Sequence, residues 1–266
     1  MNLKRIASIL RFEIIKMSHN AKAAHLASSL SCIDIVITLY DKVLKIFPTN
    51  PKNSNRDRFI LSKGHAATSL YVTLAYKGYF KKKYLKTYTK KGSRLEEHPN
   101  PSIKGVEAAT GSLGHGLPIG AGISLSAKIN KKKYKTIVLV GDGECNEGTV
   151  WEAAMFASSK KLENLYVIID RNGWQGIGKT KEILNLNLLY ERWKSFGWNC
   201  YKIDGHNHKQ IENIFNKKRN GKPTAIIANT IKGKGISFME DDNNWHYRIP
   251  NEEEVIKCKK ELGITI

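Results

Sequence analysis

The sequence predicts an α/β fold, in which a parallel β-sheet is sandwiched by helices. Segments with helical spacing alternate along the chain with short strand-like runs. These runs are apolar on both faces, as in strands that helices cover on either side. The chain has 266 residues, 41% of them hydrophobic, which is enough for a large buried core. No internal repeat or Pro/Gly/Ser-rich linker divides it, so we expect a single domain over residues 1–266.

Most of the helices are expected before residue 130 and the strands after residue 135. Isoleucine, leucine or alanine recurs about every third or fourth position in residues 3–17, 32–45, 65–77 and 115–129, which predicts helices. β-rich runs at 136–140, 165–170, 199–204 and 224–230 predict strands. In parallel sheets, ligands bind beyond the carboxyl ends of the strands. The residues that follow each run are therefore the first candidates for a functional site.

Composition excludes several classes of protein. No segment approaches the roughly 18 unbroken apolar residues of a membrane helix, which excludes a membrane-spanning protein. The first 17 residues have helical spacing and no signal-peptide cleavage site. The four cysteines are scattered without a CxxC pair, which argues against a zinc ribbon or a disulfide framework. We expect a cytoplasmic protein with no membrane contact.

The charge of the chain is strongly positive, at +20. Of the 44 basic residues, 35 are lysine and nine are arginine, whereas specific phosphate and base recognition favours arginine. The lysine runs at 81–83, 131–133 and 217–218 fall between periodic segments, where solvated turns are expected. We therefore expect a general attraction for phosphorylated small molecules and no nucleic-acid partner. A non-catalytic polyanion-binding protein is kept as an alternative.

The loop after the strand at 136–140 carries the strongest chemical pattern. Gly141 and Gly143 allow close approach of a ligand to the backbone, and Asp142 places a carboxylate at the strand end. Asn172 follows the next strand, and a βαβ unit of about 30 residues returns its second strand beside the first. A carboxylate, an amide oxygen and a nearby carbonyl suit magnesium that shares its remaining positions with phosphate oxygens. Taken singly, each of these motifs is more often only a turn.

The helix between these two loops has features of its own. Thr149 and Glu152 form the pattern of a capping box, and the amino end of the helix can offer N–H groups to an anion. Residues 150–157 are apolar all round except for Glu152. Such a helix must be covered on every side, so we expect its own sheet and a second subunit to bury it.

Together, these loops resemble the motif that binds thiamine diphosphate through a divalent metal. The similarity extends over residues 4–255, and it identifies the chain as similar to the transketolases, specifically to the amino-terminal subunit of the split, two-gene kind. The segments that carry it include RDRFILSKGHAATSLY (56–71), GSRLEEHPN (92–100), GVEAATGSLGHGLPIGAG (105–122), GDGECNEGTVWEAAMFA (141–157), DRNGWQGIG (170–178) and TIKGKGISFMEDDNNWH (230–246). The resemblance implies the pyrophosphate-binding domain of the thiamine diphosphate-binding fold.

The resemblance also implies roles for individual residues. Asp142, Asn172 and the main-chain carbonyl of Trp174 would hold Mg²⁺, or Ca²⁺ or Mn²⁺ in its place. The active-site histidines would be His25, His65, His98 and His246, and the cofactor-binding residues would be His65, Gly114, Gly141, Asp142, Gly143, Glu144 and Asn172, with Glu147 at a subunit contact. The remaining histidines, at 19, 115, 206 and 208, are expected to be structural or surface residues, with His115 the strongest exception.

The activity that the resemblance implies is transfer of a two-carbon ketol unit from a ketose or its phosphate to an aldose or its phosphate. In this family a glutamate on a separate pyrimidine-binding domain activates the cofactor, and the chain ends before any such domain. We therefore expect activity only with a partner carrying that domain, the C-terminal transketolase subunit, in an α2β2 assembly. Another thiamine diphosphate enzyme, such as a 1-deoxyxylulose 5-phosphate synthase-like or 2-oxoacid-cleaving subunit, is the alternative.

The sequence departs from the family pattern at several positions near the expected substrate. Ala27 and Glu97 stand where glycine is common, and His115 stands where glutamine is usual. Gly176 takes the place of an apolar residue near the thiazolium ring, and Tyr247 replaces a common glycine. These departures leave the metal-binding residues intact and put the identity of the sugar in question.

Overall fold

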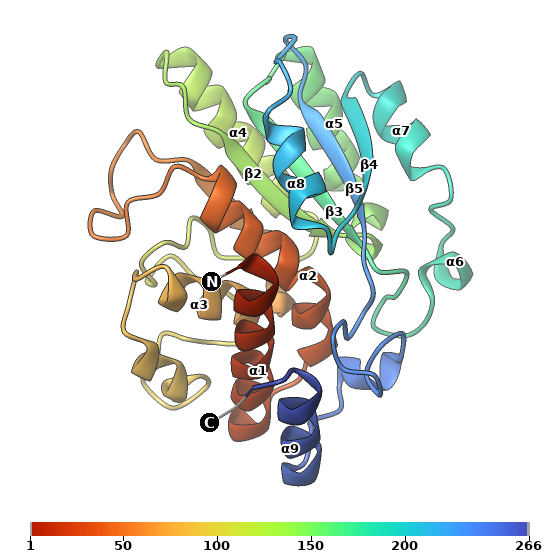
Figure 1. Ribbon diagram of the computed structural model, residues 1–266. Coiled ribbons are helices and arrows are strands. Elements are labelled where there is room, and N and C mark those ends of the chain that lie inside the picture. The colour runs from red at the N-terminus through yellow and green to blue at the C-terminus, as the bar shows by residue number, and fades with distance from the viewer. Residues whose placement is uncertain (1, 265–266) are drawn as a thin grey trace.

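The computed structural model describes residues 2–264 and shows five strands in one parallel sheet (Figure 1). The strand order is β1-β2-β3-β5-β4, with every neighbouring pair parallel. The strands are β1 (Arg58–Leu61), β2 (Thr136–Gly141), β3 (Leu165–Arg171), β4 (Asn199–Asp204) and β5 (Thr224–Asn229). The predicted α/β class with a parallel sheet is confirmed.

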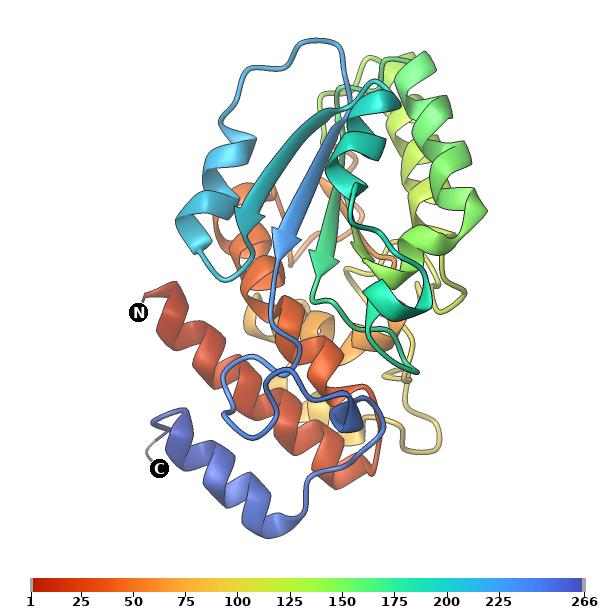
Figure 2. The ribbon, with the colours of Figure 1, turned by 90° about the vertical axis from the view of Figure 1, so that its right-hand side faces the viewer.

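Helices cover both faces of the sheet, as Figure 2 shows from the side. One face packs against α4 (Gly116–Ile129), α5 (Gly148–Ser159) and α7 (Leu189–Ser195). The other is covered by α2 (Leu26–Thr38), α3 (Ala67–Tyr76) and α8 (His208–Phe215), and α1 (Leu3–Ala21) packs on α2 and α3. Alternate residues of the central strands enter the two cores, such as Ile137 and Leu139 on one face and Val138 and Val140 on the other. This two-sided burial is the reason for the continuous apolar runs.

The remaining helical segments are short or lie outside the sheet layers. They are η1 (Leu39–Val43), η2 (Gly64–Ala66), η3 (Lys82–Thr87), η4 (Gly143–Asn146), α6 (Thr180–Ile183), η5 (Asn243–His246) and α9 (Glu252–Glu261). Helix α9 lies beside α1, so the two ends of the described chain are close together (Figures 1 and 2). None of the described helices has both the length and the apolar composition needed to cross a bilayer.

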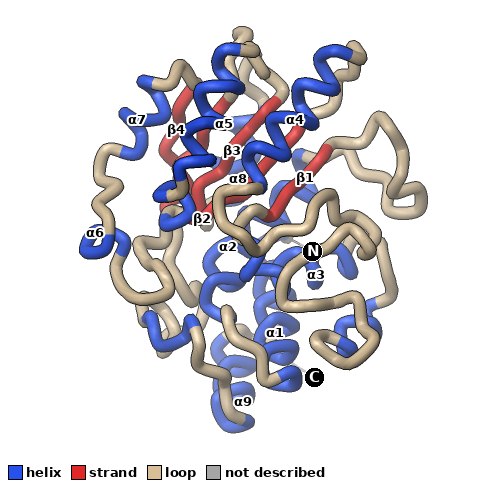
Figure 3. Tube along the Cα trace, turned by 180° about the vertical axis from the view of Figure 1, so that it is seen from behind, coloured by secondary structure: helices blue, strands red, loops and turns tan. Residues whose placement is uncertain are grey.

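Four strands match the predicted runs to within one residue, and one strand is additional. Strand β1 follows the loop after α2 and pairs with β2 at the sheet edge seen from behind in Figure 3. With only four residues, it is too short to show a clear period. Strand β4 forms the opposite edge, where Lys202 is exposed. The expectation of two apolar faces is therefore wrong for this strand, because an edge strand is only partly covered.

The limits of several helices differ from the expected ones. Helix α1 continues to Ala21 and ends at Lys22, which adopts a left-handed conformation with φ of 53°. Helix α2 begins at Leu26, six residues before the predicted start, and its first two turns include Ser28, Ser29 and Ser31, which are polar yet buried and so interrupt the apolar period. Helices α7, α8 and α9 are additional to the predicted ones. They are short, and α8 and α9 begin at asparagine caps, Asn207 and Asn251, which are signals that local pattern alone does not separate from turns.

The predicted capping box at the start of α5 is wrong. The helix begins at Gly148 with Glu147 as its N-cap, and no side chain caps it. Thr149 is already helical, and its hydroxyl donates to the carbonyl oxygen of Gly114 at 3.1 Å. Thr149 therefore joins α5 to the loop before α4 instead of closing its own helix.

Candidate active site

A cavity of about 380 Å³ lies at the carboxyl ends of β1, β2 and β3. It is lined by His25, Ser28, Lys63, His65, His98, Gly111, Leu113, Gly141, Asp142, Gly143, Glu144, Asn146, Glu147, Asn172, Trp174, Gln175, Gly176 and His246. All the predicted site residues except Gly114 are among them. Segments far apart in the sequence thus meet at the edge of the sheet where ligands of parallel α/β proteins bind.

Asp142 is held at this edge by the pairing of β2 with β3, which places Gly141 opposite Asp170. The Asp142 carboxylate is 3% exposed and accepts hydrogen bonds from the backbone N–H of Gly143 at 2.8 Å and of Gly173 at 2.9 Å. Burial and the nearby Asp170 carboxylate nevertheless raise the pKa of Asp142 to about 6. The site therefore holds a carboxylate whose negative charge is incompletely balanced, as a cation ligand requires.

Asn172 begins the turn after β3, across the edge from Asp142. Its Oδ1 accepts from the backbone N–H of Trp174 at 3.0 Å, and its Nδ2 donates to the Ser31 hydroxyl at 3.3 Å. The Trp174 indole N–H donates to Asp241 at 2.6 Å, and the Lys179 ammonium lies 4.9 Å from the ring centroid. The polar contacts of the bulky Trp174 side chain are thus with surface residues, and the turn itself borders the cavity.

The four predicted histidines form one cluster. The ring centroid of His25 lies 5.5 Å from that of His65, 6.2 Å from that of His98 and 5.0 Å from that of His246. Burial lowers the pKa of His25 and, further, that of His65. Burial and the Lys232 ammonium lower the pKa of His246 to about 3. These three imidazoles are therefore neutral near pH 7 and can both donate and accept a hydrogen bond.

Two buried lysines bring positive charge to the site. Lys63 pairs with the buried Asp170, which outweighs the opposing effect of burial and raises the pKa of Lys63. Lys232 is only 1% exposed and, in the part of the chain that the structure describes, has no carboxylate partner. Its ammonium donates instead to Asn243 Oδ1 at 2.6 Å and to His246 Nδ1 at 3.2 Å. A buried cation whose hydrogen-bond partners are neutral favours an anionic ligand.

Two of the predicted cofactor residues have a clear structural role. Gly114 has φ of +85°, and a Cβ there would lie 2.4 Å from the Thr149 hydroxyl, so it allows the loop to contact α5 just outside the cavity lining. The Glu144 carboxylate borders the cavity but accepts from the Ser62 hydroxyl and from the backbone N–H groups of Gly114 and Gly141. Glu144 thereby ties three loops of the site together.

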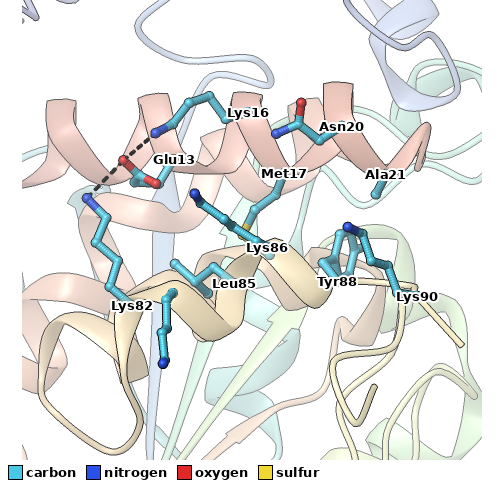
Figure 4. A pocket seen from close by; sticks show the side chains of 11 residues that line it. Glu13, Lys16, Met17, Asn20, Ala21, Lys82, Leu85, Lys86, Tyr88 and Lys90 are labelled. Atoms are coloured by element: carbon cyan, nitrogen blue, oxygen red, sulfur yellow. Dashed lines mark ion pairs between the residues drawn. The ribbon is translucent and has the colours of Figure 1, made fainter. Parts of the chain in front are cut away.

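A second cavity, of about 680 Å³, lies away from this edge, between α1 and η3 (Figure 4). Lys16, Lys82, Lys83, Lys86 and Lys90 line it. Glu13 pairs with Lys16 at 2.8 Å and with Lys82 at 3.0 Å. This second cavity contains none of the predicted site residues. Its lysines belong to the solvated basic surface that the sequence predicts.

Comparison with known proteins identifies the family. The protein-family model of the transketolase thiamine diphosphate-binding domain matches residues 3–266 of the sequence. The chain belongs to the transketolase family. It is 40% identical to one of the subunits of apulose-4-phosphate transketolase from Phocaeicola vulgatus, over 96% of this chain and 92% of that protein. It is 38% identical to the 6-deoxy-6-sulfo-D-fructose transketolase subunit SqwG of a Clostridium species, over 90% of this chain and 88% of that one.

Longer transketolases and solved structures agree with this membership. Human transketolase is 37% identical over 92% of this chain, but the match spans only 39% of the human protein. The crystal structure of transketolase from Campylobacter jejuni superposes with a TM-score of 0.92 and 32% identity, covering 99% of this chain and 43% of that one. The chain thus spans nearly the whole length of the two bacterial transketolase subunits, but only about two fifths of the length of the longer transketolases.

The residues of this transketolase-family site fit thiamine diphosphate and a divalent cation. Asp142 and Asn172 offer the hard oxygens that such a cation binds, and the raised pKa of Asp142 shows a carboxylate that a cation would stabilise. Lys232 offers a buried positive charge for an anion such as a diphosphate. Gly143 lies against Gln175, where a Cβ would come within 2.8 Å of the Gln175 side chain, so any larger residue at this position would displace Gln175.

Sequence reasoning missed several residues of the cavity, including Ser28, Lys63 and Gln175, and it missed Lys232 beside them. Lys63 and Lys232 lie inside segments that carry the family resemblance, SKGH and TIKGKG, which is the one signal that the sequence offers for them. In a chain with 35 lysines, composition and spacing do not distinguish a buried lysine from a surface one.

The histidines expected to be structural lie outside the cavity lining. His19 Nδ1 contacts the carbonyl oxygen of Pro250 at 2.8 Å, and His115 is exposed at the start of α4. His206 bonds to the buried Asp34 at 2.7 Å, and His208 bonds to the Thr38 hydroxyl at 2.8 Å. Of the family departures, Ala27 is buried in α2, whereas Gly176 borders the cavity.

Proposed function

We propose that this chain is the cofactor-binding subunit of a two-subunit transketolase, which transfers a two-carbon ketol unit from a ketose phosphate to an aldose phosphate. The observation that carries the proposal is the single cavity that joins Asp142, Asn172 and four histidines at the carboxyl edge of the sheet. Membership in the transketolase family and the names of relatives of similar length, which are transketolase subunits, support it.

In this proposal, Asp142, Asn172 and the Trp174 carbonyl hold Mg²⁺, for which Ca²⁺ or Mn²⁺ can substitute. His65, Gly114, Gly141, Gly143 and Glu144 belong to the loops that bind thiamine diphosphate. The cofactor, when bound, supplies the carbon nucleophile for breaking and forming carbon–carbon bonds. The protein supplies binding, orientation and proton positions.

The histidines are suited to sugar hydroxyls and to proton transfer. His246 Nδ1 accepts from the Lys232 ammonium, which can only donate, so the proton of the neutral ring lies on Nε2. His25 is fixed beside it, because its backbone N–H donates to the His246 carbonyl oxygen at 2.8 Å. The rings of His65 and His98 lie 5.5 Å and 6.2 Å from that of His25 and extend this polar surface. Near neutral pH, such a set can exchange hydrogen bonds with several hydroxyl groups.

We also propose that the active enzyme contains a partner with the pyrimidine-binding domain, in an α2β2 assembly. Relatives of the same length are named as subunits of a transketolase, which supports a second component. The sequence predicts that helix α5 is covered on every side, yet Met155 is 52% and Phe156 39% exposed. Ile119 on the adjacent α4 is also exposed. This apolar surface is available to a neighbouring subunit. In this proposal the protein is cytoplasmic, and residues 1–266 form one domain.

The decisive experiment is co-expression of the chain with a pyrimidine-domain protein, followed by an assay for two-carbon transfer with thiamine diphosphate and Mg²⁺. Transfer by the pair, and by neither protein on its own, is the expected result. Cleavage of a 2-oxoacid, or formation of 1-deoxyxylulose 5-phosphate, without ketol transfer between sugars would contradict the proposal.

The metal assignment has a separate test on this chain. Asp142→Ala and the gentler Asp142→Asn should weaken Mg²⁺-dependent binding of thiamine diphosphate by about tenfold or more, since each removes a charged cation ligand. Titration calorimetry measures the binding, and circular dichroism checks the fold. Asp204→Ala, an aspartate at the exposed end of the edge strand β4, is the matched control. Wild-type affinity in the Asp142 variants would refute the assignment.

A further inference from the structure

Gly176 borders the cavity and lies against the side chains of Tyr247 and His246. A Cβ built on Gly176 would lie 3.1 Å from the Tyr247 hydroxyl oxygen and 3.5 Å from His246 Nε2. The φ angle of Gly176 is not positive, so its backbone does not require glycine. A methyl group at this position would press on the Tyr247 hydroxyl, so glycine allows the close approach of that hydroxyl.

The relative position of Gly176 and Tyr247 is fixed by hydrogen bonds on both sides. Asn243 Nδ2 donates to the Gly176 carbonyl oxygen at 3.1 Å, which ties the turn after β3 to η5. Tyr247 directly follows η5, and its backbone N–H donates to the Asn244 carbonyl oxygen at 3.2 Å. The backbone of Tyr247 is thus held near Gly176 by the same short helix that carries His246.

The Tyr247 side chain lies beside the histidine cluster, just outside the residues that line the cavity. Its ring centroid is 4.6 Å from that of His246 and 6.4 Å from that of His25. It is 61% exposed, whereas Asp142 in the cavity lining is 3% exposed. Within residues 2–264, its hydroxyl has no hydrogen-bond partner. Together with His246 Nε2–H, it offers two neighbouring donors at the mouth of the site.

We propose that Tyr247 is a specificity-determining residue, whose hydroxyl bonds to a sugar hydroxyl beyond the transferred two-carbon unit, at the cavity border where Gly176 allows the Tyr247 hydroxyl to approach. The inference rests on the proposed function and names the substrate class of the site. A polyhydroxylated ketose phosphate reaches from the buried end to the mouth and meets this hydroxyl. A short 2-oxoacid that carries the same two-carbon unit has no hydroxyl there.

The test compares two donors in the assembled enzyme. D-Xylulose 5-phosphate has hydroxyls beyond the two-carbon unit, whereas hydroxypyruvate has only a carboxylate. In Tyr247→Phe, the kcat/KM ratio of xylulose 5-phosphate to hydroxypyruvate should fall about threefold to tenfold, the size expected for one hydrogen bond, mainly through KM. Tyr76→Phe, an exposed tyrosine at the end of α3, is the matched control. An unchanged ratio in Tyr247→Phe would overturn the inference.

A second variant tests the pairing of the two residues. Gly176→Ala places a methyl group against the Tyr247 hydroxyl and should lower the same ratio. In the Tyr247→Phe background, the added effect of Gly176→Ala should be small, because the oxygen it displaces is already absent. Fully multiplicative effects would show that Gly176 acts independently. If Gly176→Ala does not fold, the Tyr247→Phe ratio alone decides.

The outcomes separate this inference from the proposed function. Wild-type assembly that transfers no two-carbon unit from either donor would overturn both. Transfer from both donors with a ratio that Tyr247→Phe leaves unchanged would overturn the inference alone. The dissociation constant of D-ribose 5-phosphate, measured by calorimetry on the same variants, gives a readout independent of turnover. It should rise in Tyr247→Phe and stay constant in Tyr76→Phe.

Discussion

Two buried residues, Asp142 in the cavity and Lys232 beside it, carry charges that burial destabilises. Burial lowers the pKa of Lys232 to about 8 and raises that of Asp142 to about 6. Their opposite charges lie in the same region, and neither is fully neutralised by a side chain of the other sign. A bound cation and a bound diphosphate would stabilise both groups. This complementarity is a property of the tertiary structure, because the two residues are 90 positions apart in sequence.

The buried imidazoles make the stability of the free chain depend on pH. The pKa of His246 is about 3 in the folded chain against an ordinary value of 6.5, so between these values the unfolded chain binds the extra proton. The contribution of neutral His246 to the stability of the folded chain is therefore complete above about pH 6.5 and is lost as the pH falls toward 3. We expect the free energy of unfolding to decrease on acidification. In His246→Gln, the dependence of this free energy on pH should be weaker, by an amount that corresponds to at most about one proton bound on unfolding. Urea unfolding at pH 7, 6 and 5 measures it; parallel slopes would contradict the prediction.

At the scale of elements, one loop carries Lys232 from β5 into the site. His206, after β4, accepts the backbone N–H of Ile231 on its Nε2 at 2.9 Å. Its Nδ1 must therefore carry the proton that it donates to Asp34 at 2.7 Å. Asp34 in turn forms an ion pair with Arg11 of α1. A histidine that the sequence indicates as structural thus connects α1, α2 and the loop that positions Lys232.

Removal of this connection should affect the site from outside it. His206→Phe leaves the Ile231 N–H without its acceptor, so we expect the Lys232 loop to loosen and the affinity for thiamine diphosphate to fall about threefold to tenfold. His208→Phe is the control, since His208 also lies beside Asp34 but does not contact Ile231. Calorimetric titration with Mg²⁺ present measures the affinity, and thermal unfolding measures the fold. Equal losses in both variants would assign the effect to the Asp34 cluster as a whole.

At the scale of the whole molecule, the cavity lies at the carboxyl ends of the strands, and the helix layer of α4 and α5 has exposed apolar side chains. The burial pattern of α5 explains why its sequence looks apolar all round. Val150, Ala153, Ala154 and Ala157 pack on the sheet, while Met155 and Phe156 face outward. An exposed apolar surface of this kind is typical of a contact between subunits.

Disruption of this surface should weaken assembly without unfolding the chain. Met155→Glu places a charge on the outward face of α5, and we expect the fraction of assembled enzyme to fall, since an interface disfavours an unpaired buried charge. Sedimentation velocity of the co-expressed pair measures the assembly. Ile256→Glu, at a 64% exposed apolar position on α9, is the control. Unchanged assembly in Met155→Glu would exclude this face from the contact.

The sequence by itself determined the α/β class, four of the five strands and the juxtaposition of Asp142 with Asn172. It could do so because continuous apolar runs follow from burial on both sheet faces, and because adjacent parallel strands bring their carboxyl ends together. The short edge strand β1, the buried lysines, the start of α5 and the contact between Gly176 and Tyr247 were decided by the tertiary structure alone. Each of them depends on partners distant in the chain, whose burial and spacing no local pattern encodes.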